Sequence, residues 1–484
     1  MGAVTAFLTH YWPHIVALTS IVVGAVSAAH AAMNKNDVRA AIAWVGVILA
    51  SPLFGPLLYL IAGVNRIRHD QLSTQRSRLI KDYVHSAGEP VPDVSPMAGA
   101  QFASLRVLCD QVSRFPLHNG NHITLLDGGD AAYPAMLEAI ASASHCVALQ
   151  SYIFDHDRVG LQFADALREA QDRGVMLRVL IDSVGSRYSR PPIIRLLREH
   201  GIRAELFMTN PMGLRMAYAN LRSHRKVLFI DGHVGFMGGM NIRENFMRSL
   251  AGRHANADTH FRIEGPLATQ LFAVFANDWE VTTRERLRID DWCKTTPRAP
   301  LPHVPARCIR SGPDRFIAAT HNVLLGALAV AQHHVRIQSP YFLPDQTLLG
   351  ALNTAARRGI QVDILIPGRN NLRLVNWAMT AQLAQVIRGG CRVWRSRAPF
   401  DHSKLCTVDG GWSYVGSSNL DPRSLRLNFE LDMEVYDRNL AAQIADRIDR
   451  EIRQSDPVTL QTLDAIPYVK RLRNRIVWLA SPYL

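Results

Sequence analysis

Cysteine is scarce in this sequence and follows no metal-binding pattern. Six cysteines are spread over 484 residues, and no two of them stand in a C-x-x-C or zinc-ligand spacing. This absence argues against a zinc module. We expect the thiols to be reduced and mostly buried, as in a protein that faces the cytosol.

Acidic residues are also in short supply. Asp and Glu number 41 against 54 Lys and Arg, which gives a formal net charge of +13 and a pI near 9.8. Such an excess implies an anionic partner, which is a nucleic acid, an acidic bilayer or an acidic substrate. The sequence lacks a basic stripe interleaved with aromatic residues, so we expect no nucleic acid partner.

Charged residues are missing from two long stretches near the N-terminus. Ile15–Met33 and Ala40–Gly63 contain no Asp, Glu, Lys or Arg, and each is long enough to cross a hydrocarbon core about 30 Å thick. We therefore predict two transmembrane helices. The second stretch is the stronger candidate, and Pro52 and Pro56 should kink it. The first is rich in Ala and Ser and contains His30, so a span there is the weaker prediction.

The charges around these stretches predict their orientation. A cleaved signal peptide is the alternative to the first helix, but no Lys or Arg precedes it and a second apolar stretch follows directly. The short loop between the two carries Lys35, Asp37 and Arg39. The positive-inside rule then places this loop outside and the body beyond residue 64 in the cytoplasm. The basic residues that follow the second stretch are Arg66, Arg68, Arg76, Arg78 and Lys81.

One pattern occurs twice, as SHRKVLFIDGHVGFMGGMN at Ser223–Asn241 and as DHSKLCTVDGGWSYVGSSN at Asp401–Asn419. Both copies read H-x-K-x4-D-x6-G-[GS]-x-N. Six specified positions repeated at identical spacing are not a chance event, and they indicate a duplicated site. The shared positions are His224, Lys226, Asp231, Gly238, Gly239 and Asn241 in the first copy, and His402, Lys404, Asp409, Gly416, Ser417 and Asn419 in the second.

Each copy predicts a strand that ends in an Asp-Gly turn. Residues two apart on a strand point to the same side, so the His and the Lys of each copy should enter one cleft. Asp231 and Asp409 have the opposite parity. We include them in the catalytic motif as turn-forming or supporting groups.

Together the two copies supply two imidazoles, two ammonium groups, the amides of Asn241 and Asn419 and the hydroxyl of Ser417. This set suits a phosphodiester. One neutral His attacks phosphorus, the other, protonated, donates to the leaving oxygen, and the remaining groups bind the phosphate oxygens. The chemistry requires no metal and no cofactor. Each residue alone also has an ordinary structural explanation, and it is the matched pair that favours a site.

Residues outside the motifs are candidates for supporting roles. A nucleophilic His needs a partner on its second ring nitrogen, and Glu430 and Asp258, at matching register after the two motifs, are the candidates. An exposed carboxylate on a strand is the alternative for each. Tyr152 and Tyr341 occupy nearly equivalent places and either line the cleft or pack in the core. Arg225 should face away from the cleft, toward a lipid headgroup or solvent.

The motifs belong to a larger repeat. VALQSYIFDHD at Val147–Asp157 matches VRIQSPYFLPD at Val335–Asp345, and RGVMLRVLI at Arg173–Ile181 matches RGIQVDILI at Arg358–Ile366. Strand and helix patterns alternate in both copies, which predicts a duplicated α/β fold with pseudo-twofold symmetry and the site on the axis. The predicted parts are two transmembrane helices (1–70, with spans at about 15–33 and 40–63), a basic juxtamembrane segment and linker (71–122), a first half (123–295), a second half (306–460) and a basic amphipathic segment (461–484) that suits a membrane surface or packs on the body.

The double motif resembles that of the phospholipase D superfamily, and nearly the whole chain is similar to the bacterial cardiolipin synthases. The similarity is carried by the N-terminal apolar pair and by SHRK…GGMNI, DTHFRIEGP and VGSSNLDPRSLRLNFE. The resemblance implies tandem phospholipase D-type α/β sandwich halves at the inner membrane of a bacterium, with phosphatidylglycerol and anionic lipid as partners. It implies phosphatidyl transfer between two phosphatidylglycerol molecules through a phosphohistidine, with His224 as nucleophile and His402 as general acid and then base.

Two departures from the family pattern bear on the acceptor. Gln150 stands where the family often has an acidic residue, and Ser223 stands where Asn is common. The alternatives are a membrane-anchored hydrolase of the phospholipase D type, a phosphatidyltransferase with another acceptor such as phosphatidylethanolamine, and a non-catalytic lipid-binding scaffold. The intact motif positions argue against the scaffold.

Overall fold

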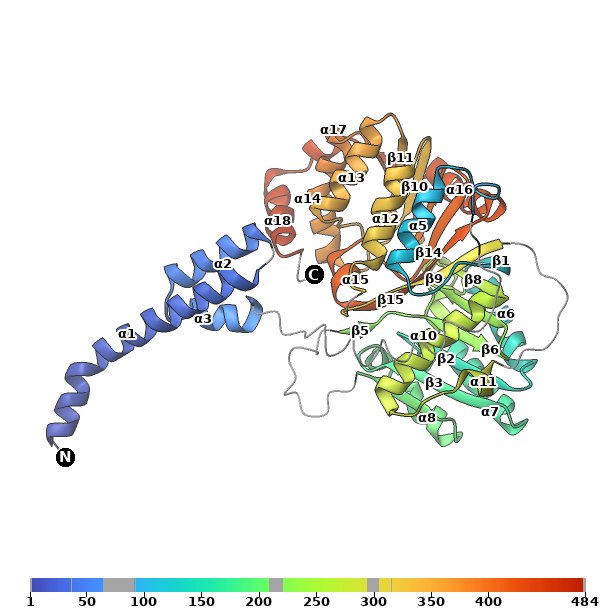
Figure 1. The fold of residues 1–484 in the computed structure, drawn as a ribbon, viewed down its shortest axis with the longest axis horizontal. Helices are drawn as coiled ribbons and strands as arrows, with labels where there is room; N and C mark the ends of the chain where they lie inside the picture. Colours follow the sequence, from blue (N-terminus) through green and yellow to red (C-terminus); the bar gives the residue numbers. More distant parts are fainter. Residues whose placement is uncertain are drawn as a thin grey trace. The chain divides into compact units, whose positions relative to one another are not determined.

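The computed structural model describes residues 2–35, 37–63, 91, 93–208, 221–293, 304–314 and 316–481. The chain divides into two compact units, Met1–Arg68 and His69–Leu484. Figure 1 shows the elements of both units. The basic residues expected to follow the second span, Arg66 to Lys81, lie outside the described residues.

The N-terminal unit is a helical hairpin. α1 (Gly2–Asn34) and α2 (Val38–Ala50) pack against each other, and Asp37 caps α2 by accepting from Ala40 N. The chain continues as α3 (Gly55–Leu58) and the π-helix η1 (Tyr59–Gly63). Tyr59 fixes this last part, because its hydroxyl lies 2.9 Å from Nδ1 of His30 in α1.

We expected the second apolar stretch to be the stronger candidate for a membrane span, but the structure favours the first. Within the described residues, one helix, His10–Asn34, is long and apolar enough to cross a membrane. The second stretch is not one helix: α2 ends at Ala50 and the helical path resumes only at Gly55. Pro52 explains the break, because it lacks an N–H and disfavours helical geometry in the residue before it.

The described strands of the body form one sheet of sixteen strands. Its order is β16-β12-β11-β10-β13-β14-β15-β9-β1-β8-β7-β6-β2-β3-β4, with β5 paired to β15. The antiparallel pair of β1 and β9 lies at the centre. Outward from this pair, equivalent strands of the two halves follow in the same order. The predicted duplication with pseudo-twofold symmetry is therefore confirmed.

The strands of the two halves have the following bounds. In the first half they are β1 (His118–Asp127), β2 (Cys146–Ser151), β3 (Met176–Asp182), β4 (Ala204–Phe207), β5 (Arg222–Ser223), β6 (Val227–Ile230), β7 (Val234–Gly238) and β8 (Thr259–Glu264). In the second half they are β9 (Val304–Ser311), β10 (His334–Gln338), β11 (Gln361–Pro367), β12 (Arg392–Ser396), β13 (Leu405–Val408), β14 (Trp412–Gly416), β15 (Asn428–Tyr436) and β16 (Asp456–Val458).

Helices cover both faces of the sheet in each half. α10 packs on one face of the first half and α6 and α7 pack on the other, while α16 opposes α12, α13 and α14 in the second half. Their bounds are α6 (Gly129–Ala141), α7 (Arg158–Asp172), α8 (Ile193–Glu199), α10 (Pro266–Thr283), α12 (Ala319–Val330), α13 (Gln346–Arg357), α14 (Arg373–Arg388) and α16 (Arg438–Arg453). Shorter helices are η2 (Gly185–Tyr188), η4 (Glu244–Phe246), α9 (Arg248–Ala251), η5 (Gly252–His254), α11 (Ile289–Trp292), α15 (Pro422–Arg426) and α17 (Leu460–Asp464), and α18 (Tyr468–Leu479) ends the described helices.

The same local signals build both halves. Asp157 caps α7 by accepting from Gly160 N, and Asp345 caps α13 by accepting from Leu348 N. After each helix a glycine takes a left-handed backbone, with φ of 84° at Gly174 and 88° at Gly359. Each glycine turns the chain into the next buried strand, β3 or β11.

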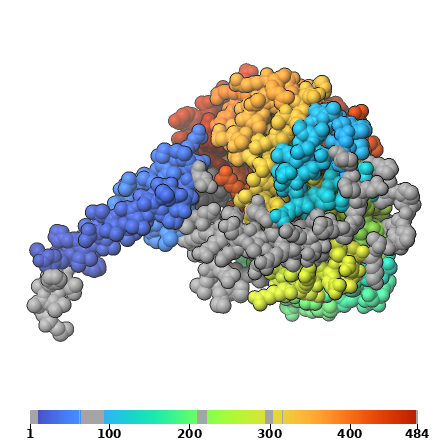
Figure 2. All heavy atoms as spheres, in the orientation of Figure 1, coloured from blue at the N-terminus to red at the C-terminus, as the bar shows by residue number. Residues whose placement is uncertain are grey.

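The segment expected to link the membrane helices to the first half contains a packed helix. α5 (Phe102–Val112) lies against α12 of the second half, and in Figure 2 cyan atoms of this part of the chain lie beside yellow ones. Its apolar face, with Phe102, Leu105 and Cys109, belongs to the core of that half. Residues 102–112 are therefore part of the second half's core, whereas we expected them to link to or pack on the first half.

Candidate active site

Each histidine segment is bound by backbone of the opposite half. β5 pairs in parallel with β15, and His224 N donates to Phe429 O at 2.9 Å. In the same way His402 N donates to Ala257 O at 2.8 Å, next to a bridge between Ala257 and Asp401. The residues after these two acceptors are the carboxylates Glu430 and Asp258. The backbone thus carries each histidine to a carboxylate from the other half.

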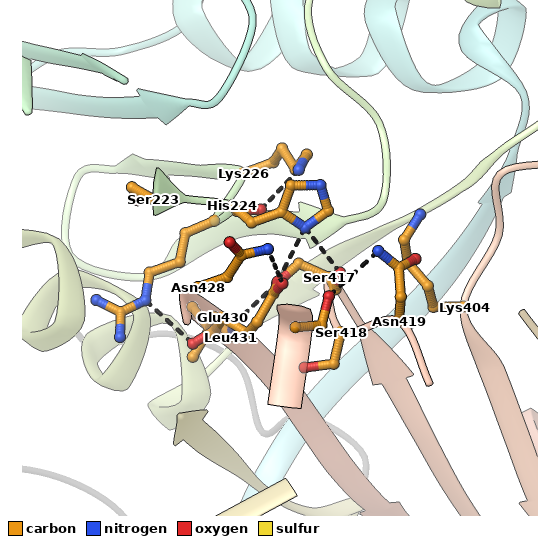
Figure 3. A network of polar contacts seen from close by, with 12 residues as sticks. Ser223, His224, Lys226, Lys404, Ser417, Ser418, Asn419, Asn428, Glu430 and Leu431 are labelled. Atoms are coloured by element: carbon orange, nitrogen blue, oxygen red, sulfur yellow. Dashed lines mark hydrogen bonds and ion pairs between the residues drawn. The ribbon is translucent and has the colours of Figure 1, made fainter. Parts of the chain in front are cut away.

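The two imidazoles lie together. Figure 3 shows the contact between His224 and Glu430. The distance from His224 Nδ1 to Oε2 of Glu430 is 2.9 Å, and that from His402 Nδ1 to Oδ2 of Asp258 is 2.8 Å. Both carboxylates are fully buried. Because a carboxylate only accepts, it selects the Nδ1–H tautomer and leaves Nε2 for the substrate. The ring centroids are 6.4 Å apart, which leaves room for one phosphorus atom at the approach distance of about 3–3.5 Å.

The lysines come from the same extended segments but not from strands. β6 and β13 begin only after Lys226 and Lys404, whereas we expected the His and Lys of each copy to lie on a strand. Lys226 Nζ donates to His224 O at 2.6 Å, and Lys404 Nζ donates to His402 O and lies 2.9 Å from the Nδ1 atom of that histidine. Both ammonium groups are buried beside the imidazoles.

Burial sets the charge state of this cluster. It lowers the pKa of His402 to about 4 and that of Lys226 to about 7, and it also lowers the pKa of His224. Burial opposes ionisation of Asp258, but the charge of Lys404 and the hydrogen bond from His402 hold its pKa at about 2. The imidazoles are therefore neutral and the carboxylates charged near pH 7. A neutral imidazole is a competent nucleophile, and the acid role requires a phosphate anion that raises the pKa of its partner.

Of the residues expected to bind phosphate, the two asparagines keep that role open, whereas Ser417 is used to hold a carboxylate. Asn241 Oδ1 accepts from Ile153 N at 3.0 Å, which turns the amide nitrogen into the end available to a ligand. Asn419 Nδ2 lies 3.2 Å from Ser424 Oγ. The Ser417 hydroxyl is used differently, since it donates to Oε2 of Glu430 at 2.6 Å and accepts from Leu431 N at 2.9 Å. Ser417 therefore holds the carboxylate that holds His224.

Asp231 and Asp409 lie beyond the strands, at turns with φ of 50° and 51°. The Asp231 carboxylate accepts from the backbone N–H groups of Ser144, His145 and Cys146. Asp409 does the same for Gln332, His333 and His334. These contacts fix the start of β2 and β10, so the structure gives both residues a turn-forming role away from the imidazoles.

Arg225 does not reach a headgroup or solvent, so that expectation is wrong. Its side chain is 1% exposed, and Nη1 donates to Oδ2 of Asp278 in α10 at 2.6 Å while Nε donates to Glu430 O at 3.1 Å. Asp278 also accepts from Nε2 of Gln150 at 2.9 Å, and Gln150 in turn contacts Ser223 Oγ at 2.8 Å. The two departures from the family pattern, Gln150 and Ser223, therefore contact each other.

The second half contains a similar buried network that we did not expect. Arg447 of α16 donates to Oδ2 of Asp401, next to His402, and to Oε1 of Gln338, both at 2.9 Å. The charges are reversed relative to the first half. There the acidic Asp278 lies on the helix α10, and the basic Arg225 lies next to His224. A signal was available, because Arg447 falls on the helical face of Ile444 and Ile448, where a buried charge needs a partner.

Aromatic rings flank the pair of histidines. The Tyr152 ring lies 5.5 Å from that of His224, and the Tyr341 ring lies 6.1 Å from that of His402. We expected the two tyrosines either to line the cleft or to pack in the core, and the structure brings both to the site. In the part of the chain that the structure describes, no cluster of three or more His, Cys, Asp or Glu side chains is arranged to hold a metal ion.

A duplicated α/β fold with two His-Lys half-sites closing over one point defines a phosphodiester-transfer centre of the phospholipase D type. The comparisons with known proteins agree. The family model "Cardiolipin synthase, PLD-like domain" matches residues 136–279 and 324–452, and "Phospholipase_D-nuclease N-terminal" matches residues 15–63. The chain belongs to the cardiolipin synthase family of phospholipase D-like proteins, and it is a phosphatidyltransferase of that family.

Relatives match over almost their full length. Cardiolipin synthase A of Pseudomonas entomophila (strain L48) is 31% identical over 98% of this chain and 99% of its own. Cardiolipin synthase A of Pseudomonas putida (strain GB-1) is 31% identical over 95% of this chain and 96% of its own. The crystal structure of phosphatidylserine synthase from Haemophilus influenzae Rd KW20 superposes with a TM-score of 0.59 at 16% identity, covering 79% of this chain and 100% of that chain. That likeness shows the fold.

Proposed function

We propose that this protein makes cardiolipin and glycerol from two molecules of phosphatidylglycerol. The single observation that carries the proposal is the pair of imidazoles, 6.4 Å apart, each bound through Nδ1 by a carboxylate of the opposite half. Such a pair supplies a nucleophile and a proton donor on two sides of one phosphorus atom. The names of the relatives support the choice of substrate and product.

The first half-reaction forms a phosphohistidine. Nε2 of His224 attacks the phosphorus of the donor lipid, and the bond from phosphorus to the glycerol oxygen breaks. His402, protonated on Nε2 in the presence of the phosphate, gives its proton to that oxygen, so glycerol leaves neutral. Lys226 and Lys404 stabilise the charge that develops on the phosphate oxygens, with the amides of the two asparagines beside them.

The second half-reaction reverses the proton flow. The neutral His402 takes the proton of the acceptor's glycerol hydroxyl, whose oxygen attacks the phosphorus. The bond between phosphorus and Nε2 of His224 breaks, and cardiolipin leaves. His402 is then protonated again, so the cycle closes with no net change in the enzyme.

The membrane arrangement is also a proposal. α1 supplies one apolar helix long enough to span, and α2 with the helical turns after it re-enters the bilayer as the second arm of the hairpin. The chain thus crosses a bacterial inner membrane with its body on the cytoplasmic side, in agreement with the excess of basic residues after residue 64. Phosphatidylglycerol in the inner leaflet is then the substrate pool.

Lipid product analysis tests the proposed function. Purified full-length protein in phosphatidylglycerol vesicles should yield cardiolipin and an equal amount of glycerol, measured by mass spectrometry, and the His224→Ala protein should yield neither. Phosphatidic acid without cardiolipin would favour the hydrolase alternative. Adding phosphatidylethanolamine tests the donor: a drop in glycerol release per cardiolipin formed, with ethanolamine released in its place, would show that phosphatidylethanolamine gives the phosphatidyl group.

A further inference from the structure

One face of α18, the last described helix of the body, packs against the second half. Asn474 of α18 is buried, and Val477 and Trp478 pack against the core of the second half. The guanidinium of Arg473 lies 3.8 Å above the ring of Trp377 in α14. We expected this segment either to suit a membrane surface or to pack on the body, and this face of α18 packs on the body.

The opposite face of α18 is apolar and exposed. Val469, Leu472, Ile476 and Leu479 follow each other at intervals of three or four residues, which places them on one stripe of a helix. Their exposed fractions run from 46% for Leu472 to 75% for Val469. A row of large apolar side chains in water on a twelve-residue helix is costly unless something covers it.

This stripe leads toward the active site. α18 runs antiparallel to α14, because Tyr468 shares a groove with Arg388 whereas Arg473 contacts Trp377. This arrangement places the start of α14 near the end of α18, and two more exposed apolar side chains lie there, Leu372 at 48% and Leu374 at 50% exposure.

The start of α14 also touches the residues around the site. Next to Leu372, Asn371 Oδ1 accepts from the hydroxyl of Tyr341 at 2.8 Å. The Tyr341 ring lies 6.1 Å from the His402 ring. Two residues, Asn371 and Tyr341, therefore connect the exposed Leu372 to the catalytic histidine.

The charge around this surface has one sign. α14 carries two basic residues, α18 carries four, and neither helix contains an Asp or Glu. The sequence has no acidic residue in 364–400 or in 465–484. Apolar side chains bordered by arginine and lysine match the interface of an anionic bilayer, where the apolar groups enter the acyl boundary and the cations meet phosphates.

We propose that Leu372, Leu374, Val469, Leu472, Ile476 and Leu479, which we call the docking stripe, seat the body on an anionic lipid bilayer. The stripe lies flat in the membrane interface and turns the histidine pair toward the headgroups, so that a phosphatidyl group reaches it without leaving the bilayer. This inference rests on the proposed function for its purpose. The docking itself is a separate physical property and is measured separately.

The first test measures depth in the full-length protein. A spin label at Ile476→Cys is compared with one at Leu161→Cys on α7, an exposed leucine at the other end of the body (Figure 1), both with Cys293→Ser. In vesicles of phosphatidylglycerol and phosphatidylcholine, the label at 476 should relax with dissolved oxygen and be shielded from an aqueous nickel complex. The label at 161 should do the reverse. A label at 476 that is open to nickel, or shielded from both reagents as in a protein contact, overturns the proposal.

The second test measures activity in two settings. The variant Leu472→Glu/Ile476→Glu should make cardiolipin about tenfold more slowly in vesicles, because two charges replace the inserted side chains. In detergent micelles that present the same lipid it should stay within about twofold of the wild type, since the variant leaves the site intact. Leu161→Glu is the matched control and should change neither rate. Wild-type turnover of the double variant in vesicles contradicts the docking stripe, whereas a lack of cardiolipin from every protein contradicts only the proposed function.

Discussion

Glu430 Oε2 lies 2.9 Å from Nδ1 of His224, although 206 residues separate the two along the chain. Asp258 of the first half makes the equivalent contact with Nδ1 of His402 in the second half. Neither half of the body therefore contains a complete imidazole and carboxylate pair. The duplicated halves form one site by exchanging their carboxylates.

The exchanged carboxylate sets the tautomer of its histidine. Glu430→Gln replaces an obligate acceptor by a neutral amide, so His224 loses both its charge partner and its fixed tautomer. We expect kcat to fall on the order of 10²–10⁴-fold, with KM for phosphatidylglycerol nearly unchanged. Steady-state kinetics checks this, and Glu244→Gln, at an exposed surface ion pair, is the control. Activity within threefold of the wild type would remove Glu430 from the catalytic account.

The pH profile should identify the two roles. Asp258 raises the pKa of His402, by its charge and its hydrogen bond, against the larger lowering by burial. Asp258→Asn removes the raising contribution, so the protonated form of His402 is lost at lower pH. If His402 is the general acid, the alkaline limb of kcat moves to lower pH in this variant while the acid limb stays in place. A shift of the acid limb instead would make His402 the nucleophile.

Ser417 should act through Glu430 and not on the phosphate. Ser417→Ala removes the 2.6 Å hydrogen bond to the carboxylate. We expect kcat to fall about tenfold, the effect of one hydrogen bond to a charged group. KM should stay within about twofold. Ser142→Ala, at the surface end of α6, is the control. A raised KM with an unchanged kcat would return Ser417 to phosphate binding.

The Arg225 and Asp278 pair should matter for stability. Arg225→Met leaves the carboxylate of Asp278 buried and short of its charged partner, which typically costs about 3–5 kcal/mol. We expect a lower melting temperature by calorimetry in detergent. Arg195→Met breaks an exposed ion pair with Glu199 and should cost at most about 1 kcal/mol. Equal melting temperatures for the two variants would show that the buried pair contributes nothing beyond a surface pair.

Local signals in the sequence predicted the halves well because the physics behind them is local. The capping Asp157 and Asp345 and the left-handed Gly174 and Gly359 act within one turn of the chain, so the matched repeats imply matched folds. The paired motif likewise predicted a shared site. These inferences required no knowledge of which segments meet across the molecule.

The remaining errors come from contacts between distant segments. Strand parity predicts an exposed Arg225, but residues 224–226 precede β6, and the side chain of Arg225 is covered by α10. The exchange of carboxylates depends on β5 pairing with β15, which no local pattern encodes. The second apolar stretch was long enough to span, yet Pro52 ends α2 after Ala50.

Rapid-quench trapping with radioactive phosphatidylglycerol tests the central claim most directly, since it asks whether the two histidines serve one phosphorus atom in different roles. The wild type and the His402→Ala protein should carry label on residue 224. In the variant the adduct should form and turn over more slowly, because neither a general acid for glycerol nor a general base for the acceptor is present. The His224→Ala protein should carry none. A labelled adduct in the His224→Ala protein would contradict the account.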